Sequence, residues 1–169
     1  MTLARKLKNM NLFLNGGGML GVVSEVTLPK ITEKNESSRY SGMLGEVDFF
    51  MGVDKLELTY KAGGLFHEGI ANFGNAKLGS DMLRWSGAVQ NGNTGEVSAY
   101  EAITRGRHTE IDLGTAKVGE GGETAMKVTC TYYKLTVDGV DVIEIDMISG
   151  LLITGGVDRT AEIRAIIGS

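Results

Sequence analysis

The chain has 169 residues, including 25 glycines but only 1 proline, and its formal net charge is −4. Abundant glycine without proline excludes collagen and proline-rich linkers. The balance of 17 basic and 21 acidic residues excludes a surface built to grip nucleic acid.

Cysteine content and hydropathy indicate the cellular compartment in which the chain folds. Cys130 is the single cysteine, so no disulfide can form within the chain. The basic start of the chain lacks the apolar run of a signal peptide, and no stretch approaches 18 consecutive apolar residues. We therefore expect one domain spanning residues 1–169, assembled in a reducing cytoplasm without stable membrane insertion.

Hydrophobic alternation predicts a mainly β chain. A first strand is expected over residues 20–28, where Pro29 ends the pattern, and a polar edge strand over 31–39. Glycines then bracket a loop over 42–54. The pattern predicts a two-turn helix over 65–73, and further strands over 55–61, 82–90, 96–105, 125–137 and 140–148.

A long hairpin over residues 125–148 is the clearest local prediction, because Asp138-Gly139 is typical of a two-residue turn. In the register that this turn sets, the pairs are Val137–Val140, Leu135–Val142, Tyr132–Ile145 and Cys130–Met147. The apolar residues then switch faces between the tip and the base. Either a bulge turns the ribbon within its own sandwich, or the tip leaves its domain and buries its second face against another subunit.

Charge is segregated between two parts of the chain. Residues 1–24 contain bases and no acid, whereas residues 138–158 contain acids and no base. This segregation suits a head-to-tail contact between copies, which produces rings or filaments. The alternative is that both parts are ordinary solvated surface. The candidate subunit-contact residues are Arg5, Lys6, Lys8, Phe49, Phe50, Met51, Asp141, Glu144 and Asp146.

Signals of enzyme chemistry are weak. The run from Gly16 to Gly21 satisfies the GxGxxG spacing of dinucleotide-binding folds, but strand-like alternation follows it where a helix should begin. A glycine-rich turn is therefore favoured over a dinucleotide-dependent enzyme. His67 and His108 lack partners at metal-ligand spacing, and Cys130 lies in a strand expected to be buried. We expect no catalytic residue, no cofactor and no metal.

Several stretches, in their order and spacing, carry a likeness to a known family. They are Arg5-Lys6-Leu7-Lys8, Val26-Thr27-Leu28-Pro29-Lys30, Arg105-Gly106-Arg107, Cys130-Thr131-Tyr132-Tyr133-Lys134-Leu135-Thr136 and Gly156-Val157-Asp158-Arg159. Through them the chain resembles, nearly from end to end, the major tail tube protein of contractile-tailed bacteriophages, a family shared with R-type bacteriocins.

The resemblance implies a β-sandwich or barrel-like tail tube fold with one short α-helix and extended loops and arms. The implied segments are an N-terminal arm over 1–18, an intersubunit loop over 42–54 and a C-terminal segment over 150–169. Hexameric rings of this chain would stack into a hollow tube that serves as a conduit for DNA ejection and a membrane-piercing rod inside the sheath.

The resemblance also implies partners and a location. The partners are further copies of the chain, the tail sheath protein, the baseplate and tail terminator proteins, and the tape measure protein in the lumen during assembly. DNA would pass through without specific binding. The location is the virion tail, after assembly in the host cytoplasm. An alternative is the tube of an R-type bacteriocin or of a secretion-system-like injection particle that carries no DNA.

Overall fold

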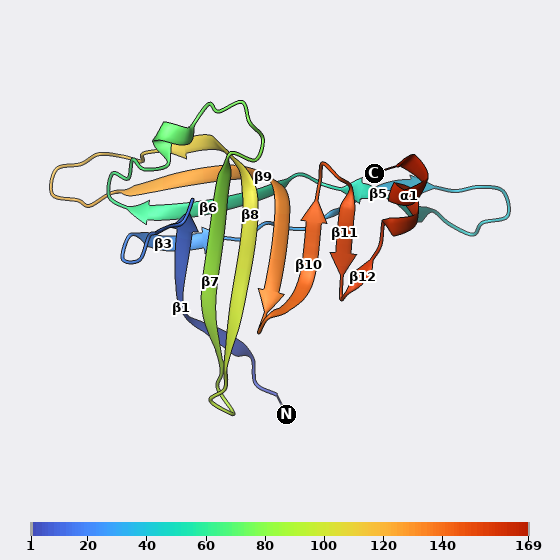
Figure 1. Cartoon of the computed structure of the whole chain (residues 1–169), viewed down its shortest axis with the longest axis horizontal. Helices are drawn as coiled ribbons and strands as arrows, with labels where there is room; N and C mark the ends of the chain where they lie inside the picture. Colours follow the sequence, from blue (N-terminus) through green and yellow to red (C-terminus); the bar gives the residue numbers. More distant parts are fainter. Residues whose placement is uncertain (1, 169) are drawn as a thin grey trace.

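The computed structural model describes residues 2–168 and is mainly β (Figure 1). Its strands are β1 (Arg5–Leu14), β2 (Gly17–Gly18), β3 (Val23–Thr27), β4 (Glu33–Ser38), β5 (Val47–Val53), β6 (Leu56–Gly63), β7 (Asp81–Asn91), β8 (Val97–Asp112), β9 (Glu123–Val137), β10 (Val140–Asp146), β11 (Leu151–Thr154) and β12 (Val157–Asp158). A 3-10 turn, η1 (Ile70–Asn72), and one α-helix, α1 (Ala161–Ile167), complete the described chain. The predicted fold class is confirmed.

Two layers arise because β8 and β9 are long enough to take part in both. In the first layer the strand order is β12-β11-β10-β9-β8-β7-β1-β2, all neighbours being antiparallel. We call this layer the wall sheet. Beyond Gly106 in β8 and before Thr131 in β9, the same two strands continue into a second layer, in which β9 pairs with β6 and β6 pairs with β3. We call the second layer the cover sheet.

Apolar side chains from the two layers meet in one core. The wall sheet contributes Leu12, Leu83, Trp85, Ala102, Tyr133 and Ile145, and the cover sheet contributes Leu56, Leu58, Tyr60, Met126 and Val128. Each of these side chains is buried, and full burial of a large apolar side chain stabilises the fold by roughly 1.5–3 kcal/mol. The core therefore fixes which face of the wall sheet points outward.

The predicted helix over 65–73 is wrong. That segment holds only η1, with Leu65 and Phe73 largely exposed, so its helix-like spacing does not mark a buried face. Gly69 packs tightly against the core, since an added Cβ would lie 2.7 Å from Met126 Sδ and 2.9 Å from Tyr60 Oη. The one α-helix instead lies in the segment 150–169, where Gly168 ends it in the left-handed conformation.

The strand expected over residues 20–28 begins later than the sequence pattern predicts. β3 begins only at Val23, while Leu20 lies in the preceding turn with 72% of its surface exposed. The segment 1–18, expected as an arm, contains β1, which pairs with β7 from Arg5 to Leu14. The polar strand expected over 31–39 exists as β4 and pairs with β5 in a separate two-stranded sheet.

The hairpin is only partly as predicted. Asp138 and Gly139 form the turn with φ of 48° and 81°, and Val137 pairs with Val140. A bulge at Val142 then shifts the register, so Leu135 pairs with Ile143 and Tyr132 with Asp146. Nearer the base the partner of β9 changes, and Cys130 pairs with Leu56 of β6 instead of Met147.

Bulges explain why the apolar face switches along this ribbon. In β9 the extra residue is Thr131, because Arg105 pairs with Tyr132 and Gly106 with Cys130. An extra residue restores the inward direction of the side chains that follow, so Cys130 and Tyr133 both join the core. The bulge within the sandwich, one of the two alternatives, is the one that the structure shows.

Candidate assembly interface

The wall sheet ends in strands that lack a partner on one side. β1 pairs with β7 along its length, but on its other side only Phe13 and Leu14 pair, with β2. At the opposite end, β12 contributes two residues to β11 and has no further strand beside it among residues 2–168. Unpaired strand edges are templates for pairing with another chain. The two ends of one sheet are thus the first candidate contact surfaces.

The segregated charges lie at these opposite ends. Arg5, Lys6 and Lys8 are exposed on β1 at one end, and β10 to β12 hold acids and no base at the other. Arg5 Nη1 donates to Ser98 Oγ at 3.0 Å, whereas Lys6 and Lys8 form no ion pair within the described chain. The basic and the acidic residues, which are far apart in the sequence, are therefore also far apart in the wall sheet.

The predicted acids Asp141, Glu144 and Asp146 share the face of the wall sheet opposite the core. Asp141 lies 3.4 Å from Lys134 Nζ, and Asp146 accepts the backbone N–H of Ile148 at 3.0 Å. Glu144 accepts the Tyr132 hydroxyl at 2.8 Å. Burial, with this hydrogen bond, raises the pKa of Tyr132 to about 12. All three acids thus have partners in their own chain.

Other charges on the outward face are also compensated. Arg84 of β7 lies 3.7 Å from Glu101 of the adjacent strand β8, and its guanidinium covers the Phe13 ring at 4.1 Å. Arg105 lies over the Tyr132 ring at 5.9 Å. The charged side chains on the outward face of the wall sheet therefore alternate in sign, with bases beside acids.

The segment expected as a loop over 42–54 is part of a protruding hairpin. β4 and β5 form an arm that extends beyond β11 and β12 (Figure 1). Phe49, Phe50 and Met51 lie in β5 and are 45%, 47% and 59% exposed. Tyr40 packs edge-on against Phe49, with ring centroids 6.4 Å apart. Phe50 lines a cavity of about 230 Å³ with Leu151 and Leu152 of β11, so it faces its own chain.

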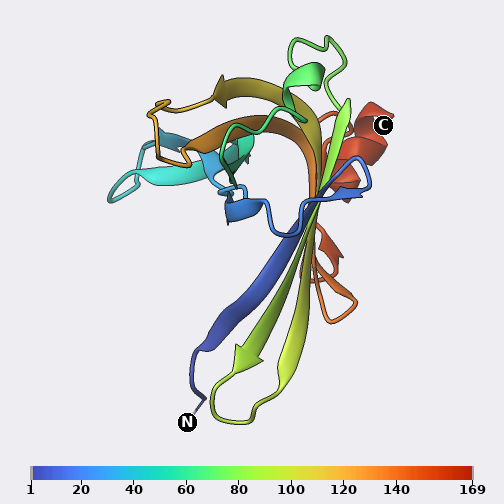
Figure 2. The same cartoon turned by 90° about the vertical axis from the view of Figure 1, so that its left-hand side faces the viewer.

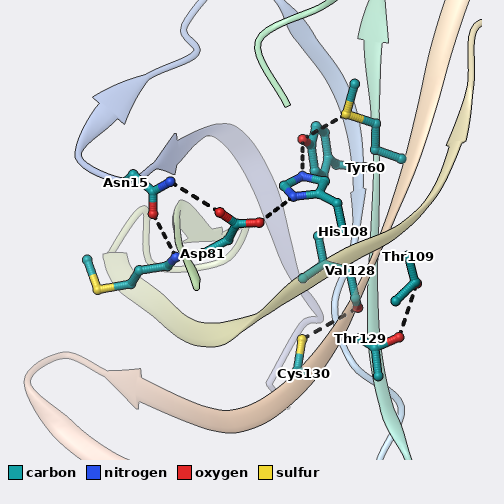
Figure 3. A network of polar contacts seen from close by, with 10 residues as sticks. Asn15, Tyr60, Asp81, His108, Thr109, Val128, Thr129 and Cys130 are labelled. Atoms are coloured by element: carbon teal, nitrogen blue, oxygen red, sulfur yellow. Dashed lines mark hydrogen bonds and ion pairs between the residues drawn. The ribbon is translucent and has the colours of Figure 1, made fainter. Parts of the chain in front are cut away.

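A buried polar cluster, missed by sequence reasoning, holds the layers together (Figure 3). His108 Nδ1 lies 2.6 Å from Asp81 Oδ2, and His108 Nε2 lies 2.8 Å from the Tyr60 hydroxyl. Asn15, in the turn after β1, donates to Asp81 Oδ1 at 3.4 Å. Burial, with the nearby Asp81 charge, raises the pKa of Tyr60. The members come from four separate segments, so no spacing in the sequence could reveal the cluster.

Replacing Asp81 with alanine tests the structural role of this cluster. The variant leaves the His108 ring N–H buried without an acceptor, which costs about 2 kcal/mol of unfolding free energy. Glu120→Ala, which breaks an exposed ion pair with Lys117, is the matched control and should change stability little. Urea titrations of both variants measure the difference. Equal stability of Asp81→Ala and wild type would contradict the role.

Burial of Cys130 should make the unfolding free energy fall as the pH rises into the alkaline range. Desolvation raises the pKa of its thiol from 9.0 to about 11. The folded chain thus binds the thiol proton more tightly than the unfolded chain does. The stabilisation that this difference provides is complete below pH 9 and is lost as the pH rises through about 11. Between pH 9 and 11, wild-type protein should lose about 2 kcal/mol more than Cys130→Ala. Parallel losses in urea titrations would contradict the effect.

The glycine run forms a turn and a short strand. Asn15 and Gly16 form a two-residue turn with φ of 48° and 87°, and Gly17 and Gly18 are β2. The glycine-rich turn is therefore confirmed. Within the described chain, no three His, Cys, Asp or Glu side chains gather to hold a metal. No helix of residues 2–168 is long and apolar enough to cross a membrane.

These features define an antiparallel β-sandwich protein whose larger sheet ends in two edge strands, each without a partner on one side among the described residues. Residues 4–168 match the family model described as phage tail tube protein FII. The chain belongs to this family of phage tail tube proteins, and is accordingly a structural protein of a phage tail. The resemblance to contractile-phage tail tube proteins is confirmed.

Two curated relatives cover most of the chain. The tail tube protein of Escherichia phage P2 is 42% identical over 172 residues, 99% of each protein. The major tail tube protein of Serratia phage KSP20 is 36% identical over 151 residues, 88% of this chain and 86% of that protein. A solved chain in the baseplate of the anti-feeding prophage (AFP) has a TM-score of 0.48 and 9% identity, over 75% of this chain and 90% of that one. That likeness is too distant to carry an argument.

Proposed function

We propose that copies of this chain join head to tail through the two ends of the wall sheet and form hexameric rings, which stack into the inner tube of a contractile tail. One observation carries the proposal: a single sheet has basic β1 at one end, and toward its other end the strands β10 to β12 hold acids and no base, with Asp158 of β12 paired to Arg164. Since the two ends differ, their contact is heterologous, and such contacts close into rings when the rotation allows. Ring closure also removes the exposed edges.

In such a ring the outward face of the wall sheet lines the channel, because the core and the cover sheet occupy its other face. Pairing of Arg84 with Glu101 and of Lys134 with Asp141 leaves these cations compensated. DNA phosphates passing along the wall would then meet few free positive charges, which favours transport without specific binding. The tube would act as a conduit for DNA ejection and as a rod inside the sheath.

The remaining partners follow from the surfaces of such a tube. The outside of the tube would contact the tail sheath protein, the two tube ends the baseplate and tail terminator proteins, and the channel the tape measure protein during assembly. Arg5, Lys6, Lys8, Phe49, Phe50 and Met51 remain the proposed subunit-contact residues. Asp141, Glu144 and Asp146 would contribute through the net negative charge of their end of the sheet.

Negative-stain electron microscopy of the purified protein tests the proposal. Tubes of uniform bore built from stacked rings are the expected result. A protein that stays monomeric at millimolar concentration, or that forms only irregular aggregates, would overturn it. Bound dinucleotide in the purified protein would instead favour an enzyme.

A further inference from the structure

The helix α1 has an apolar face that the rest of the described chain leaves uncovered. Ile163, Ile166 and Ile167 follow the spacing of three and four residues that places side chains on one face of a helix. They are 63%, 85% and 71% exposed, and no residue of α1 is buried. We call these three side chains the isoleucine face. Adjacent exposed apolar side chains on one helix are typical of a surface that packs against another molecule.

Contacts within the chain hold α1 mainly near its start. Arg164 pairs with Asp158, and the hydroxyl of Thr160, just before the helix, donates to the Gly150 carbonyl at 2.7 Å. Neither contact involves an isoleucine. Isolated helices shorter than about 12 residues are only marginally stable in water, and α1 has 7. A second surface that covers the isoleucine face would therefore stabilise α1.

The position of α1 favours a second copy of the chain as that surface. α1 follows β12, at the end of the wall sheet that the proposed ring joins to β1 of the next copy. Figure 2 views the molecule from the side of β1. There α1 and the β1–β2 turn (residues 15–16) lie at the same height, on the side of the wall sheet away from the cover sheet. A second copy placed alongside in the same orientation therefore brings its β1–β2 turn to α1.

The surface around the β1–β2 turn suits an apolar partner. Gly16, Gly17 and Gly18 present no side chains, and Leu20 shortly after them is largely exposed. The described chain itself does not require glycine at position 17. An added Cβ there would meet only the Leu14 carbonyl oxygen, at 3.4 Å, and Gly17 is not among the residues with positive φ. A backbone without side chains allows close approach of another segment.

The turn also lacks charges that such a contact would have to bury. Residues 9–24 contain no acidic or basic side chain. On α1, Arg164 is already paired with Asp158, and Glu162 is exposed beside the isoleucine face. Burial of an unpaired charge is costly. The two surfaces therefore match in being apolar and uncharged.

We propose that the isoleucine face of α1 packs on the β1–β2 turn and Leu20 of a second copy. This inference rests on the proposed ring and adds to it an apolar contact beside the sheet ends. The contact would bury isoleucines that the chain itself leaves exposed. It would also give the glycine run after β1 a role in assembly, since a bulky side chain there would hold α1 away.

Crosslinking of a double-cysteine variant tests the contact. Ile166→Cys labels α1 and Leu20→Cys labels the receiving surface of the same chain. The two positions belong to opposite ends of the wall sheet, so a short bis-maleimide cannot join them within one chain. Native Cys130 is 3% exposed and gives no background at pH 7. Unassembled protein should therefore yield few crosslinked chains.

Tubes of the double variant should give a ladder of covalent oligomers that ends at the hexamer and contains more than half of the chains. Val97→Cys with Ile166→Cys is the control. Val97 is 60% exposed but lies at the opposite end of β7 and β8 from the β1–β2 turn, so this pair should give few oligomers. Tubes without the ladder, or with an equal ladder in the control, would overturn the contact.

Hydrogen–deuterium exchange of wild-type protein decides the matter if the double variant does not assemble. Peptides covering residues 161–167 should exchange at least tenfold more slowly in tubes than in unassembled protein, because an uncovered short helix opens readily. Equal exchange in the two states would overturn the contact and would leave the isoleucine face to a different protein. Wild-type protein that forms no tubes would instead remove the proposed function itself.

Discussion

Replacing Gly106 with alanine is expected to lower the unfolding free energy by about 3 kcal/mol. Gly106 lies where β8 passes from the wall sheet to the cover sheet, opposite the bulge at Thr131. An added Cβ would lie 2.1 Å from the Thr129 carbonyl oxygen and 2.9 Å from Cys130 Cα. Both atoms belong to a backbone held by strand pairing on two sides, so neither can move away without breaking the layer junction.

Gly45→Ala is the matched control for Gly106→Ala. Gly45 lies in the loop of the arm, where an added Cβ would meet no atom within 4 Å. This control should change stability little, because neither space nor a left-handed backbone conformation demands glycine there. Urea titration followed by circular dichroism measures both variants. If Gly106→Ala unfolds at the same urea concentration as Gly45→Ala, then the layer junction tolerates a side chain and our account of the bend is wrong.

Reversing the charge of β1 should block assembly while leaving the fold intact. In the triple variant Arg5→Glu, Lys6→Glu and Lys8→Glu, each reversal costs about 1 kcal/mol of contact energy at the junction with an acidic neighbour. A total of about 3 kcal/mol raises the concentration needed for tube formation about 100-fold. The exposed positions of the three side chains leave the core unaffected.

Lys30→Glu, Lys77→Glu and Lys117→Glu together give the control for net charge. These lysines are exposed, lie away from β1, and change the net charge by the same amount. Pelleting assays over a range of protein concentrations measure assembly, and circular dichroism measures folding. If both triple variants form tubes at the same protein concentration as the wild type, then the charge of β1 has no role in assembly. Added salt should also narrow the difference, because screening weakens exposed charge contacts.

Sequence patterns predicted those features that depend on neighbouring residues. Asp138-Gly139 supplies the positive φ angles of a two-residue turn on its own, so the tip of the hairpin was predictable. The alternation of Leu56, Leu58 and Tyr60 likewise predicts a strand with one buried face, and β6 has that pattern. The pattern does not reveal β1, because its basic first half shows no alternation and its partner β7 lies far along the chain.

Features that depend on distant parts of the chain could not be predicted. The bulges at Thr131 and Val142 arise from pairing with β8 and β10, and each shifts a register that the turn alone seemed to fix. The cluster of Asp81, His108 and Tyr60 forms only when three strands converge. The charge segregation was visible in the sequence, but only the strand order places the two charged parts at opposite ends of one sheet.

Hydrogen–deuterium exchange of β1 tests the central claim most directly. In the separate chain, the outer edge of β1 from Arg5 to Asn11 has no strand beside it. Joining to the next copy would give the outward N–H groups of this segment hydrogen-bond partners. Peptides covering residues 5–11 should therefore exchange at least tenfold more slowly in tubes than in unassembled protein. Equal exchange in the two states would contradict head-to-tail joining through the wall sheet.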